Sequence, residues 1–168
     1  EMPSLCVLLL PNDNTSGLRP GMPTPQAAVA YNDLALGLIV EGITRSRFWP
    51  ETCVLVVEDD PQGGFDHVDG HRTVAFCVSP YTRRGAVDST HYDQAGMVKT
   101  IELALGLPPM NQFDLLARPM HNAFQEKADL APYTAKPNRI PLDRLNKPAE
   151  KQDPRAKAFV LQSIALDL

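Results

Sequence analysis

Apolar residues along this chain gather in three short runs. They cover residues 5–10, 52–57 and 73–78, and each run is about as long as an average strand. Runs this apolar, without polar residues at alternate positions, are typical of strands that are covered on both faces. The sequence therefore predicts three buried strands.

Two longer segments show helical spacing. Thr24 followed by Pro25 is a typical helix start, and apolar residues then recur at intervals of three and four to about residue 45. The second segment begins near Asp93 and ends at Gly106. We predict one helix between the first two strands and another after the third.

Strands that alternate with helices predict an α/β fold, with a mostly parallel sheet flanked by helices. In such sheets, ligands bind beyond the carboxyl ends of the strands. Two polar loops follow predicted strands, at residues 12–17 and 58–72. We expect these loops to meet at one edge of the sheet and to form the functional site.

The last quarter of the chain differs from the rest in composition. Prolines are spread through a polar segment, and Asp153 with Pro154 then marks the start of a short amphipathic helix. This pattern predicts an extended, proline-rich arm that lies on a surface. We therefore predict an α/β core over residues 1–123 and an arm with a short terminal helix over residues 124–168.

Composition and charge argue against some classes of binding partner. A net charge of −4 and a pI near 5.5 argue against a surface for nucleic acid or anionic membranes. We expect no transmembrane segment, because no apolar run approaches the roughly 20 residues that cross a bilayer. Cys6, Cys53 and Cys77 all lie in apolar runs, which favours small buried side chains over a disulfide scaffold.

The loop over residues 58–72 carries the strongest chemical signal, because it combines five carboxylates with two histidines and three glycines. Carboxylate oxygens suit Mg²⁺, Mn²⁺ or Ca²⁺, and imidazole shifts the preference toward Zn²⁺, Mn²⁺ or iron. Asp59 and Asp60 are adjacent at a strand end, and Pro61 supplies the turn that would bring both carboxylates to one ion. The loop is therefore a candidate metal site; a solvated acidic loop is the alternative.

The remaining polar side chains of this loop have two interpretations each. His67 and His71 would bind the metal, donate to a phosphate oxygen or protonate a leaving group. Alternatively, each is a surface histidine bonded to a nearby acid. Arg72 would hold an anion through two parallel N–H bonds, or pair with Asp66 or Asp69.

Several segments of the sequence share a likeness to known proteins. The main one is Glu-Asp-Asp-Pro-Gln-Gly-Gly-Phe-Asp-His at residues 58–67, continued to residue 73. The others lie at residues 10–13, 15, 32–33, 79–81, 99–102, 105–107 and 109–114. Together they resemble the phosphoesterase family of bacterial phospholipases C and acid phosphatases, a branch of the alkaline-phosphatase superfamily. The resemblance spans about residues 5–123 and corresponds to the C-terminal half of the family domain.

This resemblance implies a metal-dependent hydrolase of phosphate esters in a bacterial protein that is periplasmic or secreted. The implied ligands of a divalent metal (Zn, Mn, Ca or Mg) are Asp13, Asp59, Asp60 and His71. The family also has an Asp-His pair that Asp66 and His67 match. We predict His67 as a catalytic residue from this match, and Arg72 from its ability to hold an anion. The substrate would be a small phosphate ester or a phospholipid headgroup, attacked in line at phosphorus.

Two departures from the family pattern support a second hypothesis. Asn14 stands where relatives have histidine, and the family's nucleophilic Ser or Thr with its Glu-Asn pair has no counterpart in these residues. The missing N-terminal half or another subunit would have to supply that part. The alternative to an active hydrolase is a non-catalytic fragment or diverged member that binds a metal or an anion.

Overall fold

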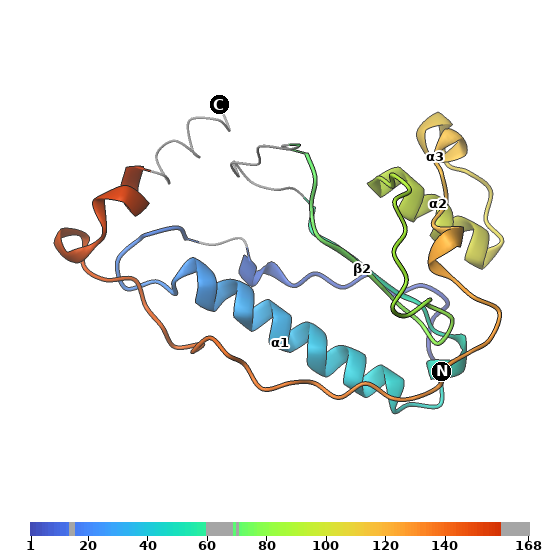
Figure 1. The fold of residues 1–168 in the computed structure, drawn as a ribbon, viewed down its shortest axis with the longest axis horizontal. Helices are drawn as coiled ribbons and strands as arrows, with labels where there is room; N and C mark the ends of the chain where they lie inside the picture. The colour runs from blue at the N-terminus through green and yellow to red at the C-terminus, as the bar shows by residue number, and fades with distance from the viewer. Residues whose placement is uncertain (14–15, 60–68, 70, 159–168) are drawn as a thin grey trace. The chain divides into compact units, whose positions relative to one another are not determined.

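The computed structural model describes residues 1–13, 16–59, 69 and 71–158 (Figure 1). The chain forms two compact units. The first contains residues 1–6, 44–58 and 74–131, and the second contains residues 7–43, 59–73 and 132–168.

The first unit contains a small antiparallel sheet. Strand β1 (Val54–Val57) pairs with β2 (Ala75–Val78), with Val54 opposite Val78 and Val57 opposite Ala75. Among the described residues the sheet has these two strands alone. The prediction of a mostly parallel sheet is therefore wrong, and the fold is mixed α/β with a two-stranded antiparallel sheet.

The connection between the strands explains this error. Parallel pairing needs a crossover of a dozen or more residues, usually helical, whereas antiparallel strands can be joined directly by a loop. The helices that flank this pair lie before β1 and after β2, and none is described between them. The positions of the strands were predicted correctly to within two residues, but their relative direction is a contact between distant residues that the apolar pattern does not specify.

The predicted strand over residues 5–10 does not form within the described structure. Its apolar side chains are largely exposed, including Val7 and Leu9. Strand structure requires a partner for the backbone N–H and C=O groups, and apolar composition alone does not supply one. The prediction of a buried strand here is therefore wrong.

Helix α1 (Pro25–Thr44) belongs mainly to the second unit. The hydroxyl oxygen of Thr24 accepts a hydrogen bond from the backbone N–H of Ala27 at 3.2 Å, so Thr24 caps the helix as predicted. By length and composition alone α1 could cross a membrane, and 17% of its most apolar 18-residue window is buried. A core helix or a signal sequence has the same composition, so α1 is consistent with a secreted protein without establishing one.

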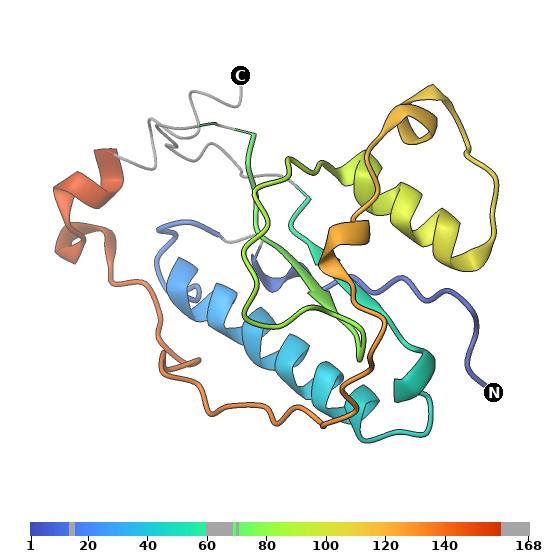
Figure 2. The same cartoon turned by 45° about the vertical axis from the view of Figure 1, so that its right-hand side comes forward.

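Helices α2 (Gln94–Leu105) and α3 (Gln112–Leu116) pack together in the first unit (Figures 1 and 2). Asp93 caps α2 by accepting a hydrogen bond from the Gly96 N–H, and Gly106 ends it in the left-handed conformation at φ 67°. These are the start and stop that the sequence predicts. The shorter 3₁₀ segments are Pro11–Asp13, Trp49–Glu51, His121–Ala123 and Ala149–Lys151.

The proline-rich arm lies extended along α1 within the second unit (Figure 2). The backbone N–H of Ala135 donates to Glu41 Oε2 at 2.9 Å near the end of α1. The arm then runs antiparallel to the helix, and at its start the N–H of Thr24 donates to the carbonyl of Arg144 at 2.9 Å. Polar contacts to a helix, rather than a periodic apolar face, therefore hold this segment in place.

Asn146 anchors the end of the arm. Its buried side-chain amide donates hydrogen bonds to the carbonyls of Gly17, Arg19 and Pro23 at 2.8, 3.0 and 3.3 Å. Its backbone N–H donates to the carbonyl of Met22 at 2.8 Å. One side chain thereby satisfies several carbonyls of the turn that precedes α1.

We expect Asn146→Ala to lower the free energy of unfolding by about 2 kcal/mol, because it leaves carbonyls of that turn without a donor. Urea denaturation followed by circular dichroism measures this change. Asn138→Ala is the matched control, because Asn138 makes a single long bond of 3.5 Å to Ala30. Equal destabilisation by both substitutions would contradict the anchor role of Asn146.

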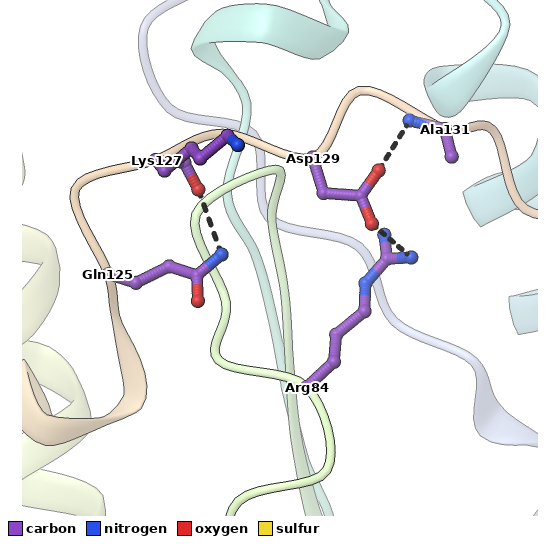
Figure 3. A network of polar contacts seen from close by, with 5 residues as sticks. All are labelled: Arg84, Gln125, Lys127, Asp129 and Ala131. Atoms are coloured by element: carbon purple, nitrogen blue, oxygen red, sulfur yellow. Dashed lines mark hydrogen bonds and ion pairs between the residues drawn. The ribbon is translucent and has the colours of Figure 1, made fainter.

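The segment after α3 is held in the first unit by a separate set of contacts (Figure 3). The backbone N–H groups of Gln125 and Asp129 donate to the carbonyls of Tyr81 and Pro80, both at 2.8 Å. The Asp129 carboxylate pairs with Arg84 at 2.8 Å. Both side chains of this ion pair are partly exposed, so the backbone bonds contribute more to the attachment than the ion pair does.

Candidate functional site

The acidic loop begins where β1 ends. The backbone N–H of Glu58 donates to the carbonyl of Val74 at 3.1 Å, which continues the strand pairing to the base of the loop. Asp59 follows in a bend with its side chain exposed. A strand pair thus fixes the starting point of the loop, and Asp59 is the first residue beyond it.

The far end of the loop forms a turn around Asp69. The backbone N–H of His71 donates to Asp69 Oδ1 at 2.9 Å, and the N–H of Arg72 donates to the Asp69 carbonyl at 3.3 Å. Asp69 Oδ1 also lies 3.4 Å from His71 Nδ1. This contact favours the proton on Nδ1 and leaves Nε2 as the acceptor nitrogen, which is the arrangement of most metal-binding histidines.

The side chains of this turn are exposed to solvent. The His71 side chain is fully exposed and that of Asp69 is 53% exposed, so their ion pair contributes little to folding. Both side chains are open to solvent and to a ligand. Arg72 is exposed beside them, and it has contacts of its own.

The second predicted loop is tied to α1 by Asn32. Its side-chain Nδ2 donates to the carbonyl of Leu10 at 2.6 Å, and its Oδ1 accepts from the backbone N–H of Asn12 at 3.2 Å. These two bonds hold the short turn Pro11–Asp13 against the helix. Asn32 therefore positions the backbone of Asp13, one of the predicted metal ligands.

A hollow of about 200 Å³ lies beside this turn in the second unit. Residues of the turn and of α1 line it, including Pro11, Asn12, Ala27, Ala28 and Tyr31. Its lining is mostly apolar with a few backbone and amide groups. The hollow therefore offers space next to the predicted ligand Asp13 but few groups that would bind an anion.

The predicted site residues fall into two groups. Asp59, His71 and Arg72 are described, whereas Asp60, His67 and the side chain of Asp13 lie outside the described part of the structure. Among the residues that are described, three or more His, Cys, Asp or Glu side chains do not come together in a metal-binding group. The metal site and the catalytic roles of His67 and Arg72 stay predictions.

Sequence reasoning did not single out two positioning residues. A bond between His71 and a nearby acid was one of the interpretations given above, and the structure identifies that acid as Asp69. An Asp two residues before a His in a glycine-containing turn is the signal that could have found it, because Asp side chains bond the backbone two residues on. Asn32 belongs to a segment named in the family resemblance, and an Asn inside an apolar helix is also a signal for a polar partner.

Comparison with known protein families identifies the chain. Residues 23–108 match the Phosphoesterase family, and this is just over half of the 168 residues. The chain belongs to the Phosphoesterase family. A search among curated proteins gave no match. The matched region runs from the start of α1 through β1, the acidic loop and β2 to the end of α2. Family membership suggests hydrolysis of phosphate esters and hence a hydrolase acting on ester bonds.

Proposed function

We propose that this protein hydrolyses phosphate esters with a divalent metal held by the acidic loop. The observation that supports this most is that the family match includes the whole loop between β1 and β2. The loop is also the part of the chain richest in metal-binding side chains. The described loop residues Asp59, His71 and Arg72 are exposed, which suits a role in binding better than a role in packing.

The described residues of the loop carry side-chain atoms that can bind a divalent metal. Asp59 offers exposed carboxylate oxygens at the start of the loop, and His71 offers Nε2 while Asp69 holds Nδ1. Asp60 and Asp13 would complete the ligand set. Mixed oxygen and nitrogen ligands suit Zn²⁺ or Mn²⁺, and a set with more oxygens suits Ca²⁺ or Mg²⁺.

The metal would supply Lewis-acid stabilisation of charge on the phosphoryl oxygens. The chain's own residues would do the rest. Arg72 would orient the phosphate through two N–H groups, and His67 would protonate the leaving oxygen. Asp69 would keep His71 in the tautomer that binds the metal.

The substrate class in this proposal is a phosphate monoester, a diester or a phospholipid headgroup. A periplasmic or secreted location goes with it, by likeness to the bacterial family members. Because the family match includes α1, we treat α1 as part of the domain in this proposal. The nucleophile would come from the preceding half of the family domain or from another subunit.

Hydrolysis of an aryl phosphate tests the proposal. We expect turnover with Mn²⁺, Zn²⁺ or Ca²⁺ that stops when a chelator is added, and loss of turnover in Asp59→Ala/Asp60→Ala. Asp69→Asn should weaken metal affinity about 10-fold, because it removes the charged partner of His71 Nδ1. Asp143→Asn, an exposed acid outside the loop, is the matched control.

Each other outcome selects a different function. Metal binding by calorimetry without turnover, in the full chain, would favour the non-catalytic metal-binding alternative. Turnover that is unchanged by chelator and by the double substitution would overturn the role of the loop. Failure to bind any of the three ions would overturn both readings of the loop as a metal site.

A further inference from the structure

Two of the three cysteines lie on the same face of the sheet. Cys77 is in β2 directly opposite Leu55, and Cys53 lies two residues before Leu55 on the neighbouring chain segment. Side chains two residues apart on a strand point to the same face, so Cys53 and Cys77 are diagonal neighbours across the pair. Sequence spacing alone gave no reason to place them together.

The two thiols interact directly. As diagonal neighbours, Cys53 and Cys77 are close enough for each thiol to shift the pKa of the other, and the Thr82 hydroxyl lies 3.6 Å from the Cys77 sulfur. The Cys53 thiol, together with the Thr82 hydroxyl, lowers the pKa of Cys77 to about 7 against the opposing effect of burial. The neighbouring Cys77 raises the pKa of Cys53 in turn. The lowered pKa makes Cys77 the more readily ionised thiol of the pair.

Accessibility completes the arrangement. Cys53 is exposed and Cys77 is half-buried, so a small reagent reaches this end of the sheet. Cys6 is also exposed, but it shares no described contact with the pair. A reactive thiolate beside a second thiol is the arrangement of redox-active cysteines.

We propose that Cys53 and Cys77 form a redox-active thiol pair, which a small disulfide oxidises to a bond linking the two strands that flank the acidic loop. This assignment does not depend on the proposed hydrolase activity. It corrects the expectation that these cysteines serve only as buried apolar side chains.

The chemistry balances in two exchange steps. The Cys77 thiolate attacks one sulfur of the small disulfide and forms a mixed disulfide, and the other half leaves as a thiolate. Cys53 then loses its proton to solvent and attacks the Cys77 sulfur, which releases the second half as a thiolate. The two cysteines are oxidised, and the small disulfide is reduced to two thiols.

Oxidised glutathione and the full chain carrying Cys6→Ser test this proposal. We expect peptide mapping under non-reducing conditions to show a link between Cys53 and Cys77 that dithiothreitol removes. The linked form should have a Tm higher by about 5 °C, since the link closes a loop in the unfolded chain. In Cys53→Ser the mixed disulfide on Cys77 should persist, because the resolving thiol is absent.

The rate of Cys77 alkylation provides a second, independent readout. It should rise through a midpoint near pH 7, and Thr82→Val should move that midpoint upward while Thr82→Ser, which keeps the hydroxyl, should not. Persistent glutathione on both cysteines of the Cys6→Ser protein, or links only between chains, would overturn the proposal. So would an alkylation midpoint at the ordinary value of a free thiol.

Discussion

Gly96→Ala is expected to lower the free energy of unfolding by about 3 kcal/mol. A Cβ atom at this position would lie 2.4 Å from the backbone oxygen of Arg118 and 3.2 Å from Asp93 Oδ1. Both neighbours are fixed, because Asp93 caps α2 and the chain after Arg118 is bonded to the same helix. The overlap must therefore be relieved by moving backbone.

Thr100 makes that movement costly. Its buried hydroxyl donates to the carbonyl of Gly96 at 2.7 Å and accepts from the N–H of Met120 at 2.8 Å. Displacing the segment near Arg118 would stretch the Met120 bond and leave a backbone donor without its acceptor. The close approach of that segment to α2 is thus the physical reason for a glycine here.

Gly42→Ala is the matched control for this prediction. Gly42 lies in the exposed part of α1, and a Cβ there would meet no described heavy atom within 4 Å. We expect it to raise the free energy of unfolding by about 0.5–1 kcal/mol, because alanine favours helix. Urea denaturation of both variants decides the matter: a Gly96→Ala protein as stable as wild type would contradict the close packing of α2 against residue 118.

The helices show what the sequence predicts well. Capping residues and apolar spacing are local signals, and both ends of α2, at Asp93 and Gly106, were predicted from them. The cap of α1 at Thr24 was predicted in the same way. Local hydrogen bonds decide these features, so a single sequence contains the information.

The sheet and the site depend on contacts between distant residues. The sequence predicts where β1 and β2 lie, but not that they pair in antiparallel register. In the same way, composition predicts a metal-binding loop, whereas the Asp69–His71 contact depends on a turn geometry. The pairing of Cys53 with Cys77 requires the strand register, which no motif encodes.

A buried pair of carboxyl groups joins α2 to α3 and makes the stability of the first unit depend on pH. Glu102 and Asp114 are 4% and 2% exposed. Burial raises the pKa of Glu102, and the hydrogen bond and charge of Asp114 raise it further, while Lys99 opposes this. Burial and the neighbouring Asp114 both favour the protonated form of Glu102, whose carboxyl oxygens are otherwise buried without a hydrogen-bond partner.

Asp114 is kept ionised by backbone donors. Burial alone would raise its pKa, but the N–H groups of Asn111, Met110 and Leu115 and the Glu102 side chain lower it below the usual value. Its Oδ1 accepts from Asn111 and Leu115, both at 2.9 Å, and its Oδ2 accepts from Met110 at 2.7 Å. Asp114→Asn would turn one of these acceptors into an N–H that faces another N–H. We expect it to lower the Tm by roughly 10 °C.

The two shifts act in opposite directions with pH. Glu102 has a raised pKa in the folded state. Its contribution to the free energy of unfolding is therefore complete below its ordinary pKa of 4.5 and is lost as pH rises through the raised pKa. Asp114 has a lowered pKa in the folded state. Its contribution to the free energy of unfolding is therefore complete above its ordinary pKa of 3.8 and is lost as pH falls through the lowered pKa. The Tm of the wild type should therefore fall, through Glu102, as pH rises from mildly acidic to neutral.

Glu102→Gln separates this pair from the other titrating groups of the chain. Glutamine has nearly the same shape as glutamic acid but cannot ionise, so the variant should lose the Glu102 part of the decline in Tm with rising pH. Its Tm should exceed that of the wild type at neutral pH and approach it in mild acid. Glu126→Gln, the same change at an exposed position, should leave the slope of Tm against pH unaltered. Parallel wild-type and Glu102→Gln profiles from pH 4 to 8 would show that Glu102 does not have a raised pKa in the folded protein.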